Sequence, residues 1–160
     1  MEHVLGQTEK PQGCLFEPAG NWPQDRNSLL LFRDRMTVVL LNRFPYANGH
    51  LLVAPRRHTA DICELSSDEQ AALFAMLANS TAILRQHLSP DGFNIGLNLG
   101  PVAGAGIADH LHFHIVPRWQ GDHNFMTVCA EIRTIPQHIE HTFDLLAPDF
   151  ARLAQQEEER

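Results

Sequence analysis

Apolar and polar residues alternate in several short segments of the chain, which is the pattern of β-strands with one buried face. The runs 29–32 and 36–41 are rich in β-favouring residues and flank the polar turn 33–35, so they predict two consecutive strands. A third strand is expected over residues 50–54, after the turn-forming segment 45–49.

A long amphipathic helix is predicted next. Ser66 and Glu69 have the Ser-x-x-Glu spacing of a capping box, in which the two side chains satisfy backbone N–H groups at the helix start. Pro90 and Gly92 end the pattern. Apolar residues recur between these limits at steps of three and four: Leu73, Met76, Leu77, Ile83, Leu84 and Leu88. We expect this stripe to pack on the sheet, with Met76 and Phe74 in or near the core.

The two ends of the chain have less regular patterns. Residues 1–27 are rich in Gly, Pro, Gln and Asn without periodicity, so we expect a surface arm, pinned by Phe16 and Trp22. Residues 28–160 are expected to form a single domain.

After the polar loop that begins at residue 120, a short strand is expected over 126–129. Pro136 is expected in the first turn of a last helix that ends near Pro148. The closing run of Gln and Glu is read as a solvated segment.

The segment 110–119 shows the strictest alternation in the chain. One face is apolar and can enter a core: Leu111, Phe113 and Ile115. The opposite face presents three imidazoles, those of His110, His112 and His114, and successive histidines on one strand lie about 7 Å apart.

Three interpretations of this histidine row are open. A solvated edge strand places polar residues outward, although histidine is not specially strand-forming. A metal site, and with it a metalloenzyme, is a second interpretation, because imidazole is the commonest protein ligand of zinc. The third is a catalytic row in which a neutral imidazole attacks phosphorus while its neighbours supply protons and hydrogen bonds.

The segment before the histidines has matching features. Residues 93–99 alternate, and if they pair with the histidine strand, a polar row lies beside the imidazoles: Asn94, Gly96 and Asn98. The connecting loop 100–109 contains Gly100, Gly104 and Gly106, and glycine-rich loops can direct backbone N–H groups at a phosphate. Together these features favour a phosphate-handling site.

Composition excludes several function classes. With 160 residues, 44% of them hydrophobic and 19% charged, the chain fits an ordinary single globular domain. The formal net charge of −7 argues against a nucleic-acid partner. Cys14, Cys63 and Cys129 are widely spaced and odd in number, which argues against a disulfide framework. Because no apolar run approaches the length of a membrane span, we expect a cytoplasmic protein that does not bind membranes.

The run His110-Leu-His112-Phe-His114-Ile-Val116 matches the His-φ-His-φ-His-φ-φ signature, with φ apolar, of the histidine triad (HIT) superfamily of nucleotide hydrolases and transferases. The resemblance covers about residues 28–120 and includes three further matches: 41–43, 49–55 and Asn98. The branch that the chain most resembles contains fragile-histidine-type dinucleoside polyphosphate hydrolases and bacterial diadenosine tetraphosphate phosphorylases. The runs 104–110 and 117–122 look more like the phosphorylase-like members.

The resemblance implies catalytic roles for four histidines. His112, the middle histidine of the motif, would attack the α-phosphorus of a nucleotide, with its other ring nitrogen donating to a backbone carbonyl. His110 and His114 would contact phosphate oxygens or the leaving group. His50, on the neighbouring strand, would complete the constellation.

The resemblance also implies substrate-binding residues. Asn42, eight residues before His50, would hold the ribose, and Asn98 would lie near the phosphates. Backbone donors would come from a short run of the loop: Gly104, Ala105 and Gly106.

Cofactors are expected to be few. Phosphoryl-group transfer relies on positioning and on neutralising oxygen charge, so no resident metal is required, although Mg²⁺ can accompany a polyphosphate substrate. Several family members hold structural zinc on a Cys-x-x-Cys pair and histidines, one of them like His58. Here the pair reads Cys14-Leu-Phe-Glu17, with the second thiolate missing. We therefore favour a buried thiol and a loop histidine over structural zinc.

The fold implied by the resemblance agrees with the pattern. It is an α+β domain of the HIT-like type, with a mainly antiparallel five-stranded meander, one long helix on a face and a C-terminal helix. A homodimer is expected, with Trp119 reaching toward the partner's site.

The leading hypothesis is an enzyme that cleaves dinucleoside polyphosphates, diadenosine tetraphosphate first, through a nucleotidyl group on His112. The acceptor, water or inorganic phosphate, is left open. Two alternatives are a nucleoside phosphoramidate hydrolase and a nucleotide-binding or sensor protein with negligible turnover.

Overall fold

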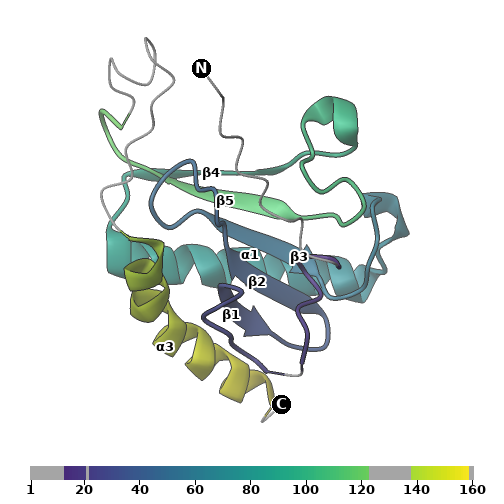
Figure 1. Cartoon of the computed structure of the whole chain (residues 1–160), viewed down its shortest axis with the longest axis horizontal. Helices are drawn as coiled ribbons and strands as arrows, with labels where there is room; N and C mark the ends of the chain where they lie inside the picture. Colours follow the sequence, from purple (N-terminus) through teal and green to yellow (C-terminus); the bar gives the residue numbers. More distant parts are fainter. Residues whose placement is uncertain (1–12, 21, 123–137, 159–160) are drawn as a thin grey trace, which may run out of the picture.

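The structure, a computed structural model, describes residues 13–20, 22–122 and 138–158 (Figure 1). Five strands form one antiparallel sheet: β1 (Leu30–Arg33), β2 (Thr37–Leu41), β3 (Leu51–Pro55), β4 (Gly92–Leu97) and β5 (Phe113–Arg118). Two long helices accompany them, α1 (Ser67–Leu88) and α3 (Ile139–Glu158), with short 3-10 turns at η1 (Ile62–Glu64) and η2 (Pro101–Ala103). The predicted α+β class is confirmed.

The strand order is β1-β2-β3-β5-β4, so the last two strands are exchanged relative to a simple meander. After β3 the chain runs through α1 to the far edge of the sheet, where β4 lies, and β5 returns between β3 and β4. In this register His114 lies opposite Leu52 of β3 and Gly96 of β4. The predicted pairing of the polar row with the histidine strand is therefore confirmed at Gly96.

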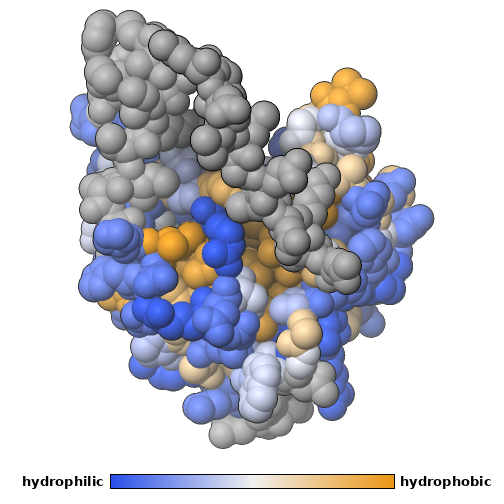
Figure 2. Space-filling model, viewed as in Figure 1, coloured by the Kyte–Doolittle hydropathy of each residue, from blue (hydrophilic) through white to orange (hydrophobic). Residues whose placement is uncertain are grey.

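The two faces of the sheet bury separate apolar clusters. The larger cluster lies against the helices and includes the predicted apolar face of the histidine segment, with Leu111 and Ile115 buried and Phe113 packed against it. The smaller cluster lies on the opposite face and joins Phe16 to Leu52 and other strand residues. Figure 2 shows hydrophobic residues gathered near the centre of one face, bordered by hydrophilic ones. Because directly opposed residues share a face, His114 lies on the side of Leu52 and the smaller cluster.

Helix α1 begins as the capping box predicts. The Ser66 hydroxyl accepts from the Glu69 N–H at 3.2 Å, and the Glu69 carboxylate accepts from the Ser66 N–H at 2.8 Å. The Arg57 guanidinium also binds this carboxylate, at 2.8 and 2.9 Å, and together with Ser66 it lowers the pKa of Glu69 to about 2.

Phe74 of the same helix is 76% exposed, so its predicted place near the core is wrong. It follows Leu73 directly and therefore points about 100° away from the buried stripe.

Helix α3 continues past Pro148 to Glu158, so the predicted end near Pro148 is wrong. A proline inside a helix removes a hydrogen bond and costs about 3 kcal/mol. Beyond the proline, Phe150 is fully buried and Leu153 packs on the same cluster, and burying such side chains contributes about 1.5–3 kcal/mol each. Tertiary packing thus offsets the local penalty. The predicted strand 126–129 and the predicted helix start at Pro136 lie outside the described residues.

Phe16 anchors the N-terminal arm, because its side chain is fully buried. The buried Arg33 guanidinium adds hydrogen bonds to three carbonyl oxygens of the arm, those of Pro18, Gly20 and Trp22. Trp22 itself is 69% exposed, so its predicted role as a second pin is wrong. Among the described residues, no helix has the length and apolar character needed to cross a membrane.

Candidate active site

Three of the four predicted catalytic histidines lie together, and we call His50, His112 and His114 the His112 group. His50 immediately precedes β3, whereas His114 lies in β5 and His112 just before it. The ring centroids of His50 and His112 lie 5.1 and 5.0 Å from that of His114. The Nε2 atom of His50 is 2.9 Å from Nδ1 of His114, so these two rings are hydrogen-bonded.

The backbone fixes the tautomer of His50 and, through it, that of His114. The Tyr46 N–H donates to Nδ1 of His50 at 3.1 Å, so this nitrogen is an acceptor and the neutral ring carries its hydrogen on Nε2. That N–H donates to Nδ1 of His114. The hydrogen of a neutral His114 therefore lies on its Nε2, and the ring presents a donor there.

The backbone assigns the opposite tautomer to His112. Its Nδ1 lies 2.9 Å from the carbonyl oxygen of His110, and because a carbonyl oxygen only accepts, Nδ1 carries the hydrogen. The Nε2 of His112 is left with a free lone pair. Two neighbouring imidazoles of one strand segment thus offer a nucleophile and a hydrogen-bond donor.

The rings of the His112 group are largely removed from solvent. His50 is fully buried and His112 is 5% exposed. Burial, followed by the neighbouring His112 ring, lowers the pKa of His114 below the ordinary value of a histidine. Because the charged form of His114 is disfavoured, its neutral tautomer described above is favoured.

Tyr46 belongs to the same site and was not predicted. Its ring lies nearly parallel to that of His114, with centroids 6.0 Å apart and an interplanar angle of 17°, and 4.7 Å from the His50 ring. Tyr46 is 53% exposed. The only sequence signal is its position in the turn before His50, which says nothing about where the ring points.

His110 departs from the row that the alternation predicted. Strand β5 begins at Phe113, so His110 precedes it and the three histidines do not share one regular strand. His110 is fully buried, and its Nε2–H donates to the Pro55 carbonyl oxygen at 2.8 Å. Its Nδ1 is 3.1 Å from Sγ of Cys14. This geometry gives no support to the predicted contact of His110 with phosphate.

Of the two predicted amide residues, Asn42 contacts the His112 group and Asn98 contacts the glycine loop. The Asn42 side-chain nitrogen is 3.3 Å from Nδ1 of His50, while its oxygen accepts from the Phe44 N–H at 3.0 Å. The Asn98 side chain donates to the Gly104 carbonyl oxygen at 3.3 Å. Their predicted contacts with ribose and phosphates stay predictions.

The glycine loop is folded on itself. The Gly104 N–H donates to the Pro101 carbonyl oxygen, and the Ala105 N–H donates to that of Gly100. Gly100 and Gly104 adopt positive φ angles of 81° and 88°, which explains glycine at these two positions. Two of the three predicted amides at 104–106 are therefore engaged within the loop, and the predicted phosphate cradle stays a prediction.

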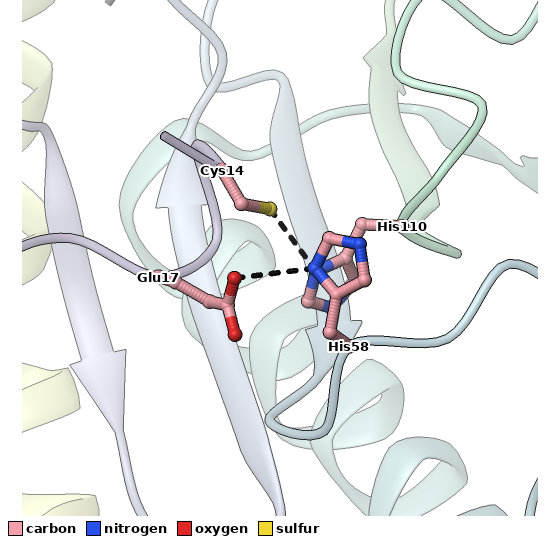
Figure 3. Close-up of side chains that lie close together, drawn as sticks. All are labelled: Cys14, Glu17, His58 and His110. Atoms are coloured by element: carbon pink, nitrogen blue, oxygen red, sulfur yellow. Dashed lines mark hydrogen bonds and ion pairs between the residues drawn. The ribbon is translucent and has the colours of Figure 1, made fainter. Parts of the chain in front are cut away.

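A second constellation, which we call the Cys14 cluster, lies beside the His112 group and consists of Cys14, Glu17, His58 and His110 (Figure 3). One ligand atom from each residue lies within 4.8 Å of all the others. His58 Nδ1 is 3.1 Å from the Glu17 carboxylate. Burial raises the pKa of the Cys14 thiol. The sequence favoured a separate thiol and loop histidine, whereas the fold brings both to one point.

Known proteins similar to this chain share its fold and its histidine motif family. The family model of the HIT domain matches residues 24–121. The AP-4-A phosphorylase of Mycobacterium tuberculosis is 40% identical over 138 residues, which cover 85% of this chain and 71% of that protein. A hypothetical histidine triad nucleotide-binding protein from Sulfolobus tokodaii superposes with a TM-score of 0.64 at 25% identity, covering 80% of this chain and 87% of that one.

A zinc-bound histidine triad family protein from Mycobacterium smegmatis superposes with a TM-score of 0.63 at 29% identity, and the match again covers 80% of this chain and 87% of that one. The histidine motif, the antiparallel sheet and these relatives all lead to one assignment. The chain belongs to the HIT family.

Proposed function

We propose that this protein is a nucleotidyl-transferring enzyme that cleaves dinucleoside polyphosphates, with diadenosine tetraphosphate as the first candidate substrate. The observation that carries the proposal is the pair of opposite tautomers at His112 and His114, each set by a hydrogen-bond partner of fixed polarity. The name of the mycobacterial relative, AP-4-A phosphorylase, supports the choice of substrate.

In the first half-reaction the Nε2 lone pair of His112 attacks the α-phosphorus. A nitrogen–phosphorus bond forms, and the bond from phosphorus to the leaving polyphosphate oxygen breaks, so the oxygen departs with its electron pair as part of ATP. The His114 Nε2–H donates a hydrogen bond to phosphate oxygen and stabilises the departing charge. The imidazolium formed at His112 keeps its Nδ1–H on the His110 carbonyl oxygen, which stabilises the positive charge.

In the second half-reaction an acceptor oxygen attacks the same phosphorus, and the electron pair of the nitrogen–phosphorus bond returns to His112. Water must lose a proton in this step, whereas an anionic phosphate oxygen needs no base. Because His114 presents a donor rather than an acceptor at Nε2, this geometry favours inorganic phosphate. Phosphorolysis would convert the adenylyl group to ADP.

Product analysis tests this function. The purified protein is incubated with diadenosine tetraphosphate, with and without phosphate, and the nucleotides are resolved. ADP and ATP that form only with phosphate support phosphorolysis, whereas AMP and ATP without phosphate indicate hydrolysis. Absence of turnover with retained nucleotide binding would contradict the enzyme and favour the binding or sensor alternative.

We also propose that the protein is a homodimer that pairs through the edge of the sheet. β4 is the last strand in the order, and its Ile95 side chain is 47% exposed although the neighbouring Ile115 is fully buried. An exposed apolar residue on an edge strand favours association. Light scattering of the wild type and of Ile95→Arg tests this proposal. A dimer is expected for the wild type and a monomer for Ile95→Arg, and a monomeric wild type would contradict the proposal.

Trp119 offers no support for reaching a partner, because its Nε1–H donates to the Leu88 carbonyl oxygen of its own chain.

A further inference from the structure

In the arm segment 14–17, two residues with metal-binding side chains, Cys14 and Glu17, flank the buried aromatic ring of Phe16. Phe16 is fully buried, and its ring centroid lies 4.9 Å from that of His110 and 5.0 Å from that of His112. Cys14 and Glu17, its near neighbours in the chain, both point into the Cys14 cluster (Figure 3). A ligand held by both Cys14 and Glu17 would therefore restrain the backbone on either side of this ring.

The four donors suit a divalent transition metal. Cysteine sulfur, imidazole nitrogen and carboxylate oxygen bind zinc at about 2.0–2.3 Å, so ligand atoms around a tetrahedral ion are separated by about 3.3–3.8 Å. The Cys14 cluster, with its ligand atoms within 4.8 Å of one another, needs only small side-chain adjustments. His110 is already prepared, because its Nε2–H donates to the Pro55 carbonyl oxygen and its Nδ1 faces the cluster.

We propose that the Cys14 cluster binds one Zn²⁺, with Glu17 as an oxygen ligand in place of the second thiolate of relatives, and that the bound ion positions Phe16 against His112. On binding, the Cys14 thiol releases its proton to solvent, and one thiolate and one carboxylate balance the charge of the ion. The positioning part of this inference depends on the proposed function, whereas the metal site does not.

Glu17 gives this site a distinct character. A carboxylate is a harder ligand than a thiolate, so zinc is expected to bind less tightly than it would with two cysteines. Without metal, the His58 contact with Glu17 joins two side chains that are 45% and 47% exposed, and such a pair contributes little to stability. A metal ion gives a stronger reason for four donors from three separate segments to converge.

Metal titration of the chelator-treated full chain tests the site. Zn²⁺ is expected to bind with one equivalent. Because loss of an outer-sphere partner alone weakens metal sites about 10- to 100-fold, Glu17→Gln and Cys14→Ser are each expected to weaken zinc binding by about 100-fold or more. Glu17→Cys restores the second thiolate and is expected to bind more tightly than the wild type. Cys63→Ser removes an exposed thiol outside the cluster and serves as the control.

Cobalt(II) as a probe reports the ligands without reference to activity. A thiolate-to-cobalt charge-transfer band is expected for the wild type, roughly doubled in Glu17→Cys and absent in Cys14→Ser. Failure of the wild type to bind one equivalent of Zn²⁺, or binding by Glu17→Gln and Cys14→Ser equal to that of the wild type, would overturn the metal site. Neither result depends on whether the protein is an enzyme.

The positioning role has its own test. Zinc is expected to raise kcat of the wild type on diadenosine tetraphosphate with little change in KM. In Phe16→Leu, which keeps an apolar side chain, zinc is expected to bind as in the wild type but to leave kcat unchanged. An equal increase of kcat in both proteins would overturn the role of Phe16, while leaving the metal site and the proposed reaction intact.

Discussion

Two groups of imidazoles lie side by side in this molecule, and their hydrogen-bond partners separate their roles. In the His112 group, backbone groups and a neighbouring ring hold one side of each ring and leave Nε2 of His112 and of His114 for other contacts. In the Cys14 cluster, by contrast, Nδ1 of His110 faces the Cys14 thiol, and Nδ1 of His58 faces the Glu17 carboxylate. His110 and His112 are only two positions apart in one motif but lie in different groups. Both precede β5, which begins at Phe113, so the alternation of a regular strand does not force their rings onto one face.

The largest effect is expected at the nucleophile. His112→Ala removes the attacking lone pair, and loss of a residue of this kind lowers kcat by about 10⁴-fold or more. Nucleotide binding, measured separately by calorimetry, should be retained. His58→Ala, in the other group, is the matched control and, with both variants and the wild type measured free of zinc, should leave most of the turnover. Similar losses in both variants would remove the distinction between the two groups.

A smaller loss is expected when the tautomer of His114 is no longer fixed. His50→Ala removes the N–H that donates to Nδ1 of His114, so His114 is free to carry its hydrogen on either nitrogen. We expect kcat to fall by about 10²-fold, the usual size of such contributions. His141→Ala on α3 is the control. Undiminished turnover in His50→Ala would contradict the assignment of the His114 tautomer.

These residues show which parts of the fold and of the site could be predicted from the sequence. Alternation and the capping box predicted the strands and α1, because local periodicity and burial act together there. The catalytic roles of His112 and His114 came from the family resemblance alone and stay predictions. The convergence of Cys14 with His58 and His110 depends on contacts across 96 residues of chain, which spacing does not encode. The hydrogen-bond partners of His50 were also beyond prediction, since they follow from the path of the turn at Tyr46.

The stability of the fold should depend on pH through His114. Burial lowers its folded-state pKa, so below the ordinary pKa of about 6.5 the unfolded chain binds more protons than the folded one. The free energy of unfolding is therefore expected to decrease as the pH falls from about 6.5 through the lowered pKa. Denaturant unfolding across this range should show a weaker dependence in His114→Asn, whose neighbours His50 and His112 remain. An unchanged slope would show that His114 is not held neutral by burial.

The smallest expected effect concerns the loop that carries His58. Glu69→Gln weakens two interactions. One is the bidentate contact with Arg57, which directly precedes His58, and the other is the hydrogen bond from the Ser66 N–H that completes the capping box. We expect the free energy of unfolding to fall by about 1 kcal/mol. Asp68→Asn removes the same charge from the same helix turn and is the control. A loss of turnover as large as that of His50→Ala would indicate that the loop also supports the His112 group.

The most direct measurement is the capture of the intermediate on His112. The protein is mixed with diadenosine tetraphosphate without phosphate, quenched rapidly under alkaline conditions that preserve nitrogen–phosphorus bonds, and digested for mass spectrometry. We predict one adenylyl group on the peptide that contains His112, and its disappearance when phosphate is added before the quench. Turnover with no adduct on that peptide, or an adduct on another histidine, would contradict the account.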